Sequence, residues 1–187
     1  EMVDFASISG HSLVVATNPL FPMTAMRSRL AWGGFSSSDH LFQSVTSYEN
    51  MHFAKPNPAY YAEILAVLGW PLQPIGMIGN SLRDDIVPVT SLGFPAYWLN
   101  GHASEVPETI RHLVTPGTFE TIQPWIDSLQ NSSYDLTPKT ISAILAVLKS
   151  TPAALQQLTR NLTEDCWHRK ITANKPSLLE IISRLLE

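Results

Sequence analysis

Three short stretches carry the residues of this 187-residue chain that could bind a phosphate group and a metal ion. Thr17 and Asn18 end the first stretch, Lys55 stands before Pro-Asn-Pro in the second, and the third, 78–85, reads Ile-Gly-Asn-Ser-Leu-Arg-Asp-Asp. Each stretch follows an apolar run or opens a helix, which is where open α/β sheets bind phosphate and metal ions. Together they predict phosphoryl chemistry.

Thr17 and Lys55 have the functional groups that phosphoryl transfer requires, because charge on the phosphoryl oxygens must be neutralised while a nucleophile attacks. The Thr17 hydroxyl can donate a hydrogen bond to those oxygens, and Lys55 offers a positive charge with three donors. Each residue also has an ordinary explanation, since a Thr that ends a strand is more often a loop residue and a lone Lys is most often solvated. The order of the three stretches favours the functional interpretation.

The third stretch offers oxygen ligands for a metal ion. Asn80, Asp84 and Asp85 supply amide and carboxylate oxygens, which Mg²⁺ prefers together with water and phosphate. One of the two aspartates could instead only stabilise the N-terminal end of a helix, because its negative charge interacts favourably with the helix dipole. The six His residues show no spacing typical of a metal site, so we assign none of them to a metal ion.

Apolar runs that stop at turn residues predict the strands that position these stretches. The runs are 12–16, 75–78, 96–99 and 112–114, and we expect them to be successive strands of one sheet. Their near-continuous apolar sequences, with helices between them, favour parallel βαβ units. The expected fold class is α/β, with a doubly wound, parallel, Rossmann-like sheet.

Two helices are expected beside the candidate site residues. Asn57 and Pro58 have the residue types of an N-cap and a first helical position, and Gly69 marks the end of that helix. A second helix is expected over 83–92, although Pro88 should kink it or shift its start.

The C-terminal part of the chain is expected to be a short all-helical segment. The polar segment 127–136 carries no apolar periodicity, and we interpret it as a linker between a core, 1–126, and the helical segment, 137–187. Within the helical segment, Ser150-Thr151-Pro152 is expected to end one helix and restart another. Ser177 and Glu180 stand at the spacing of a capping box, which predicts a last helix.

Composition narrows the classes of partner. A net charge of −4 supplies no basic field that would draw the chain onto nucleic acid or a membrane surface, so neither partner is expected. The single cysteine, Cys166, excludes an intrachain disulfide and any multi-cysteine metal site. No apolar run reaches the roughly 20 residues of a membrane span, and no targeting signal is present. These features predict a cytoplasmic protein.

The first 126 residues resemble the C-terminal two-thirds of a haloacid dehalogenase superfamily hydrolase core, and the three stretches quoted above carry this resemblance. That resemblance implies a Thr or Ser after a strand, a Lys at a helix start and an acidic magnesium motif, which here are Thr17, Lys55 and 79–85. The site residues that it implies are Thr17 and Lys55 for catalysis, Thr17, Asn18 and Lys55 for the substrate, and Asp85, Asn80 and Asp84 for the metal ion. The implied function is a Mg²⁺-dependent phosphatase acting on a small organic phosphate.

Two departures from the family pattern limit that expectation. Asn80 replaces the first acidic residue of the magnesium motif, which keeps an oxygen ligand but weakens the attraction for a cation. The family's nucleophile motif, a strand ending in Asp-x-Asp, occurs nowhere in the chain and would precede residue 1, so we expect this chain to be inactive alone. The alternative is a non-catalytic binding or regulatory protein, in which a degenerate hydrolase core is fused to a helical interaction module.

A second, fainter resemblance concerns the helical segment. Residues 148–155 and 175–187 resemble the opening helices of a DinB-like bundle, which implies a metal-binding His near the end of the second helix. Arg184 occupies that position and Pro176 replaces a usual Trp, so a metal site is not expected there. Substrate identity and oligomeric state are left open by the sequence.

Overall fold

The computed structural model describes residues 9–35, 41–130, 140–172 and 174–185. The chain divides into two compact units, Glu1–Ala154 and Leu155–Glu187. Within the described ranges, no helix is both long and apolar enough to cross a membrane.

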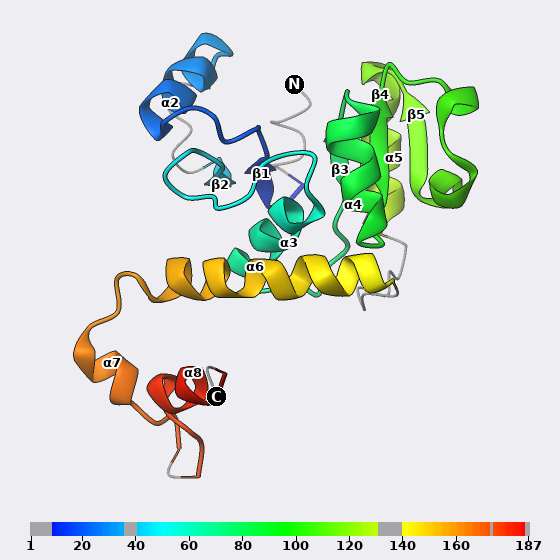
Figure 1. Cartoon of the computed structure of the whole chain (residues 1–187). Helices are drawn as coiled ribbons and strands as arrows, with labels where there is room; N and C mark the ends of the chain where they lie inside the picture. The colour runs from blue at the N-terminus through cyan, green and yellow to red at the C-terminus, as the bar shows by residue number, and fades with distance from the viewer. Residues whose placement is uncertain (1–8, 36–40, 131–139, 173, 186–187) are drawn as a thin grey trace. The chain divides into compact units, whose positions relative to one another are not determined.

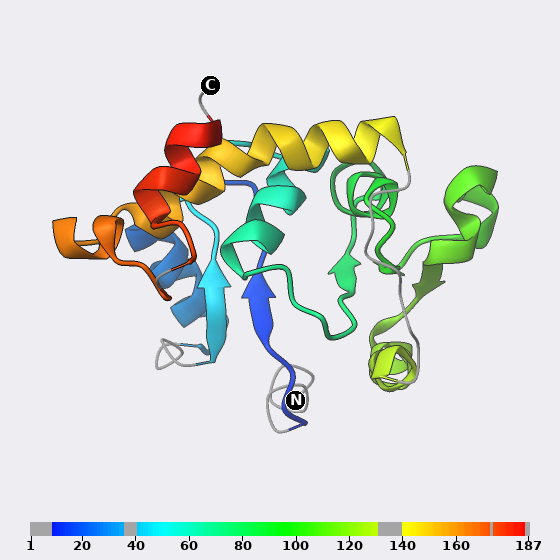
Figure 2. The same cartoon turned by 90° about the horizontal axis from the view of Figure 1, so that it is seen from below.

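The first sheet of the larger unit consists of β1 (Leu13–Val15) and β2 (Phe42–Val45), which pair in parallel. In Figure 2 the arrows of the two strands point in the same direction. Helix α2 (Met23–Trp32) connects them, as a βαβ unit requires. The predicted strand at 12–16 is thereby confirmed as β1.

The second sheet consists of three parallel strands in the order β3-β4-β5. The strands are β3 (Met77–Gly79), β4 (Ala96–Leu99) and β5 (Val114–Gly117). Side chains of β4 alternate between two clusters, since Ala96 and Trp98 join the core that contains α3 and α4, whereas Tyr97 joins the cluster of α5. Figure 1 shows α4 (Val87–Ser91) and α5 (Ile122–Gln130) on opposite sides of this sheet. Helices on both faces of parallel strands confirm the predicted α/β class.

Two details of the predicted strands are corrected. The strands form two sheets and not one, because in the described part of the chain β1 pairs only with β2 and β3 only with β4. The last strand lies at 114–117, not 112–114, and follows a 3-10 helix, Glu108–Leu113. Pro116 obscured this strand, although a proline is tolerated there because β5 is an edge strand.

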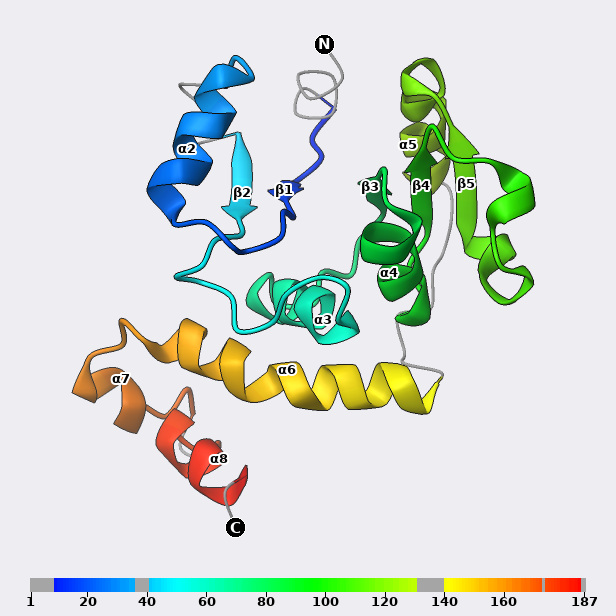
Figure 3. The same cartoon turned by 45° about the horizontal axis from the view of Figure 1, so that its top comes forward.

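Helix α3 (Pro58–Val67) connects the first sheet with the second and begins as predicted. Asn57 Oδ1 accepts the Ala59 N–H at 3.0 Å, and Gly69 follows the helix with φ of +77°. The helix buries every residue from 59 to 65. Figure 3 shows α3 between β1 and the α4 side of the second sheet.

The segment after β3 begins with a π-helical turn. This turn, η2 (Leu82–Ile86), is followed directly by α4, in whose first turn Pro88 lies. Of the two effects expected of Pro88, a kink or a shifted start, the structure shows the second, because α4 begins at Val87. A proline is tolerated there because the first turn of a helix needs no N–H. Short 3-10 helices complete this unit at Ala103–Glu105 and Phe119–Thr121.

Two predictions about the helical segment are corrected. Helix α6 (Ile141–Thr159) runs through Pro152 without a restart, and its buried positions are small residues, including Ala146, Ser150 and Ala153. The first four residues of the predicted linker belong to α5, because Leu129 packs with Tyr97 and Trp125. Residues 131–136 of that linker lie outside the described residues, so the boundaries 1–126, 127–136 and 137–187 stay predictions.

The smaller unit contains α7 (Glu164–His168) and α8 (Leu178–Leu185). Its capping box is confirmed, since Glu180 Oε2 accepts the Ser177 N–H at 3.0 Å and Ser177 Oγ accepts the Glu180 N–H at 3.3 Å. Lys170 also reaches Glu180, at 2.9 Å. The resemblance to a DinB-like bundle stays a prediction.

Candidate phosphate-binding site

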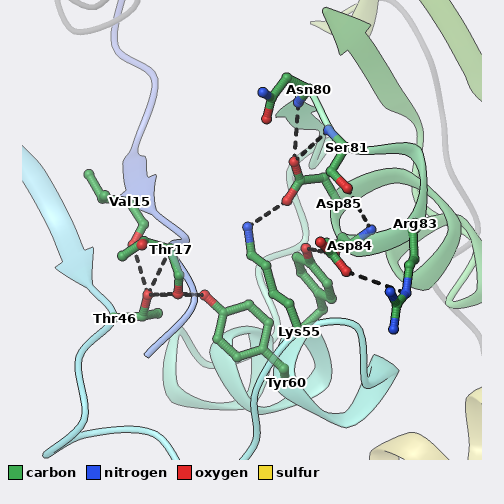
Figure 4. Close-up of polar contacts among 11 residues, drawn as sticks. Val15, Thr17, Thr46, Lys55, Tyr60, Asn80, Ser81, Arg83, Asp84 and Asp85 are labelled. Atoms are coloured by element: carbon green, nitrogen blue, oxygen red, sulfur yellow. Dashed lines mark hydrogen bonds and ion pairs between the residues drawn. The ribbon is translucent and has the colours of Figure 1, made fainter. Parts of the chain in front are cut away.

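A buried ion pair lies at the centre of the candidate site. Lys55 Nζ donates to Asp85 Oδ1 at 2.6 Å, and the two side chains are only 10% and 8% exposed (Figure 4). Lys55 Nζ also lies 6.0 Å from the ring centroid of Tyr60 and 5.9 Å from that of Tyr61. These distances are at the upper limit of a cation–π contact. A buried pair of this kind is stable only if its remaining polar atoms are hydrogen-bonded.

The second carboxylate oxygen of Asp85 meets that requirement. Oδ2 accepts the backbone N–H groups of Asn80 at 3.1 Å and Ser81 at 3.0 Å, which come from the turn that leaves β3. Gly79 makes this approach possible, because an added Cβ there would lie 2.6 Å from the Asp85 Cγ. These hydrogen bonds fix the Asp85 carboxylate against the end of β3. The fixed carboxylate then positions the Lys55 ammonium through its Oδ1.

The end of β1 is fixed by groups from β2 and α3. The Thr17 N–H donates to Thr46 Oγ1 at 2.9 Å, and the Thr17 carbonyl accepts from Thr46 Oγ1 at 2.8 Å and from the Tyr60 hydroxyl at 2.7 Å (Figure 4). Burial raises the pKa of the Tyr60 phenol, so this group stays protonated and donates. Tyr61, the next residue of α3, donates to the carbonyl of Asp84 at 2.7 Å. Helix α3 thus ties the end of β1 to the turn that carries Asp85.

Several polar groups at this place have no partner within the described part of the chain. The Thr17 hydroxyl makes no hydrogen bond there, and the Asn18 Oδ1 is buried without one. The Lys55 ammonium has three protons, of which Asp85 accepts one. The site therefore has donors, an acceptor and a positive charge whose hydrogen-bonding capacity the described residues do not fully use.

Two of the predicted metal-binding residues, Asn80 and Asp84, have side chains that do not contact the Lys55–Asp85 pair. The Asn80 side chain is exposed and makes no hydrogen bond among the described residues, although Trp98 Nε1 holds its carbonyl at 3.1 Å. The Asp84 carboxylate lies 3.9 Å from Arg83 Nε and is half-exposed. Figure 4 shows Asn80 above Asp85 and Asp84 on the side of Arg83. The structure thus brings Lys55 and Asp85 into contact, and Tyr60, which lies next to Lys55, links them to Thr17. The side chains of Asn80 and Asp84 do not contact this pair.

Comparison with known structures identifies the fold of the chain. A HAD phosphatase structure from Thermococcus onnurineus matches with a TM-score of 0.52 and 19% identity, over 68% of this chain and 56% of that chain. An uncharacterized protein from Listeria monocytogenes serotype 4b matches with a TM-score of 0.54 and 14% identity, over 70% and 78%. The fold is haloacid dehalogenase-like.

In sequence, the haloacid dehalogenase-like chain is similar to a curated archaeal protein. It is 30% identical over 66 residues to a glyceraldehyde 3-phosphate phosphatase of Methanothermobacter thermautotrophicus strain Delta H. The match covers 35% of this chain and 29% of the relative, so the chain corresponds to less than a third of that protein's length. No family model matches the chain.

The haloacid dehalogenase-like core offers a hard cation only part of a coordination shell. Asp85 Oδ2 accepts two N–H groups, and Oδ1 keeps one lone pair beside its bond to Lys55. The Asn80 amide oxygen makes no hydrogen bond to the residues that the structure describes. Among the described residues, no three His, Cys, Asp or Glu side chains gather closely enough to hold a metal ion. Mg²⁺ often takes only one or two protein carboxylates and keeps water and phosphate oxygens, so Asp85 fits it as part of a ligand set, whereas only the backbone N–H of Asn80 contacts Asp85.

Sequence reasoning missed three side chains that position the site. Tyr60, Tyr61 and Thr46 were not singled out as site residues. A usable signal was present, because two tyrosines in a helix whose other residues are almost all apolar must find partners for their hydroxyls once buried. Those partners are the Thr17 and Asp84 carbonyls, one on each side of Lys55.

Proposed function

We propose that this chain carries the phosphate- and metal-binding half of a haloacid dehalogenase-like phosphatase site for a small organic phosphate. The observation that carries the proposal is the Lys55 ammonium, which Asp85 holds at 2.6 Å. Tyr60 links this pair to Thr17, whose hydroxyl has no partner among the residues that the structure describes. A buried cation beside free donors suits an anion better than any neutral ligand. The phosphatase named among the sequence relatives supports the choice of a phosphate ester.

In this proposal, the chain's own residues bind and orient a phosphoryl group. The two remaining protons of Lys55 and the hydroxyl of Thr17 donate to phosphoryl oxygens, and the side-chain NH₂ of Asn18 donates to a neighbouring oxygen. Asp85 orients Lys55 through the hydrogen bond between them. Asp85 and Asn80 are the residues that would hold Mg²⁺, which when bound would share the negative charge of the phosphoryl oxygens.

The proposal assigns binding, and not attack, to these 187 residues. No Asp-x-Asp motif is present in the sequence, so none of the carboxylates is assigned the role of nucleophile. We expect the pure chain to bind inorganic phosphate in the presence of Mg²⁺ and to leave an aryl phosphate unhydrolysed. Vigorous Mg²⁺-dependent turnover by the pure chain would contradict this assignment.

Calorimetric titration of inorganic phosphate into the chain, with Mg²⁺ present, tests the binding site. Lys55→Met removes the cation and should weaken phosphate binding by at least about tenfold. Lys149→Met is the matched control, because it removes the same charge from an exposed position of α6 and should leave the affinity unchanged. Equal phosphate affinities of the chain and the Lys55 variant would overturn the proposal.

Asn80 favours a second candidate, a non-catalytic binding or regulatory protein. A neutral ligand in place of a carboxylate lowers the attraction for a divalent cation, and a binding protein needs no metal ion. The same titration separates the two candidates. Phosphate affinity that rises with Mg²⁺ and falls in Asn80→Ala favours the phosphatase site, whereas affinity indifferent to both favours the binding protein.

A further inference from the structure

Three large apolar side chains are exposed within a few residues of the candidate phosphate site. Leu20, Phe21 and Tyr48 are 67%, 48% and 73% exposed, and we refer to them as the apolar shelf. A single exposed apolar residue needs no explanation, but several gathered at one place mark a binding surface. The shelf lies after β1 and β2, at the carboxyl ends of parallel strands, where ligands bind in open α/β sheets.

Backbone hydrogen bonds hold the shelf against the phosphate-binding residues. The Leu20 N–H donates to the Asn18 carbonyl at 2.8 Å, which folds Leu20 back beside Asn18. The Tyr48 N–H donates to the Phe21 carbonyl at 2.9 Å, just beyond the point where Thr17 and Thr46 bond to each other. The loops after β1 and β2 therefore run together, and both carry shelf residues.

The shelf is also supported from α2. The guanidinium of Arg29 lies over the Phe21 ring, 5.6 Å from its centroid. The Glu49 carboxylate, next to Tyr48, accepts the Met23 N–H at 2.9 Å and so fixes the start of α2 against the loop after β2. These contacts hold the shelf residues in place without covering them, which is the condition for preorganised binding.

We propose that the apolar shelf receives the organic part of the substrate and selects phosphate esters with an aromatic or similarly flat apolar group. The proposal rests on the proposed function, because the phosphoryl group bound at Thr17 and Lys55 places the ester oxygen next to the shelf. Aromatic side chains bind such a group through burial and ring contacts, while a polyol chain would lose hydrogen bonds to water on the same surface. Phosphate contacts hold every ester alike, so discrimination falls to Leu20, Phe21 and Tyr48.

Binding of three probes to the whole chain, with Mg²⁺ present, tests the proposal. The probes are inorganic phosphate, glycerol phosphate and phenyl phosphate. Calorimetry measures the affinity of each probe, and the NMR signals of the Thr17 and Asn18 backbone amides report where it binds. Phenyl phosphate should bind about five- to tenfold more tightly than glycerol phosphate, a ratio expected from partial burial of one ring. Phe21→Ser and Tyr48→Ser should each reduce that ratio and leave the affinity for inorganic phosphate within about twofold.

Trp32→Ser provides the matched control. Trp32 is an exposed aromatic residue at the opposite end of α2 from the shelf, so its loss should leave the ratio unchanged. Because all of these positions are exposed, the variants should keep the circular dichroism spectrum of the chain.

Each other outcome is decisive. If inorganic phosphate binds through Lys55 but the two esters bind equally, the shelf proposal fails and the proposed function stands. If the ratio is present but survives in both shelf variants, the shelf proposal also fails. If neither phosphate nor ester binds, or binding survives in Lys55→Met, the proposed function fails and the shelf proposal with it.

Discussion

Two buried carboxylates, Asp85 and Glu63, hold the two ends of the short segment that contains the candidate lysine. Asp85 Oδ1 accepts from Lys55 Nζ at 2.6 Å, while Glu63 Oε1 lies 2.7 Å from His52 Nδ1 and Glu63 Oε2 accepts the His52 N–H at 3.1 Å. Glu63 is completely buried in α3, and Asp85 nearly so. Burying a carboxylate costs free energy, so each must have partners that offset the cost.

The two carboxylates differ in what surrounds them. Glu63 receives both of its hydrogen bonds from one residue, His52, whose side chain is 44% exposed, so it clamps the segment locally. Asp85 takes donors from the β3 turn and from Lys55, and Lys55 keeps protons to spare beside the Thr17 hydroxyl. Burial alone therefore does not identify a functional carboxylate. What distinguishes Asp85 is the unused hydrogen-bonding capacity of the groups next to it.

The isosteric change Asp85→Asn should have the largest effect. An amide can accept from the Asn80 and Ser81 N–H groups only by turning its NH₂ toward the Lys55 ammonium, which leaves a buried cation without a partner. We expect a loss of about 3–5 kcal/mol in the free energy of unfolding, the usual cost of breaking a buried pair. Urea unfolding measures it, and phosphate affinity should fall in the same variant. A loss below that of the Glu63 variant would reverse the comparison.

The matched change Glu63→Gln should have a smaller effect. The glutamine oxygen can accept the His52 N–H, and its NH₂ can donate to His52 Nδ1 when the imidazole carries its proton on Nε2. Both hydrogen bonds can therefore be kept, and we expect a loss of roughly 1–2 kcal/mol by urea unfolding. Phosphate affinity should stay within about twofold of the unchanged chain. A large drop in phosphate affinity would show that the two carboxylates do not differ as argued.

Sequence pattern was sufficient where one residue type dictates one local structure. Asn57 and Pro58 begin α3 as expected, and the apolar run at 96–99 is β4, with both faces buried. Strand β2 escaped notice because Phe-Gln-Ser-Val has neither alternation nor an apolar run, and α2 because it buries only Met26 and so carries no apolar stripe. Elements held mainly by tertiary contacts leave a weak pattern.

The candidate site shows the same division. Residue types and order were enough to single out Thr17, Lys55 and Asp85, but not the contact between Lys55 and Asp85, which are 30 positions apart. The role of Gly79 could not be foreseen either, because it depends on the Asp85 side chain folding back over the end of β3. Spacing gives the chemistry that a site can perform, whereas the partner of each group depends on packing.

Glu180 is an exposed carboxylate, and replacing it should affect stability less than replacing Asp85 or Glu63. The Lys170 ammonium and the Ser177 N–H hold the pKa of Glu180 below its ordinary value. A carboxylate whose pKa is lower in the folded than in the unfolded state stabilises the fold above its unfolded pKa, and that contribution is lost as the pH falls through its folded pKa. Solvent screens an exposed pair, so the effect should be the smallest of the three.

Glu180→Gln should therefore change the urea unfolding midpoint slightly near neutral pH and not at all below the folded pKa of Glu180. Urea unfolding across that pH range measures the difference. A difference that persists at the acidic end would mean that Glu180 acts through packing and not through its charge.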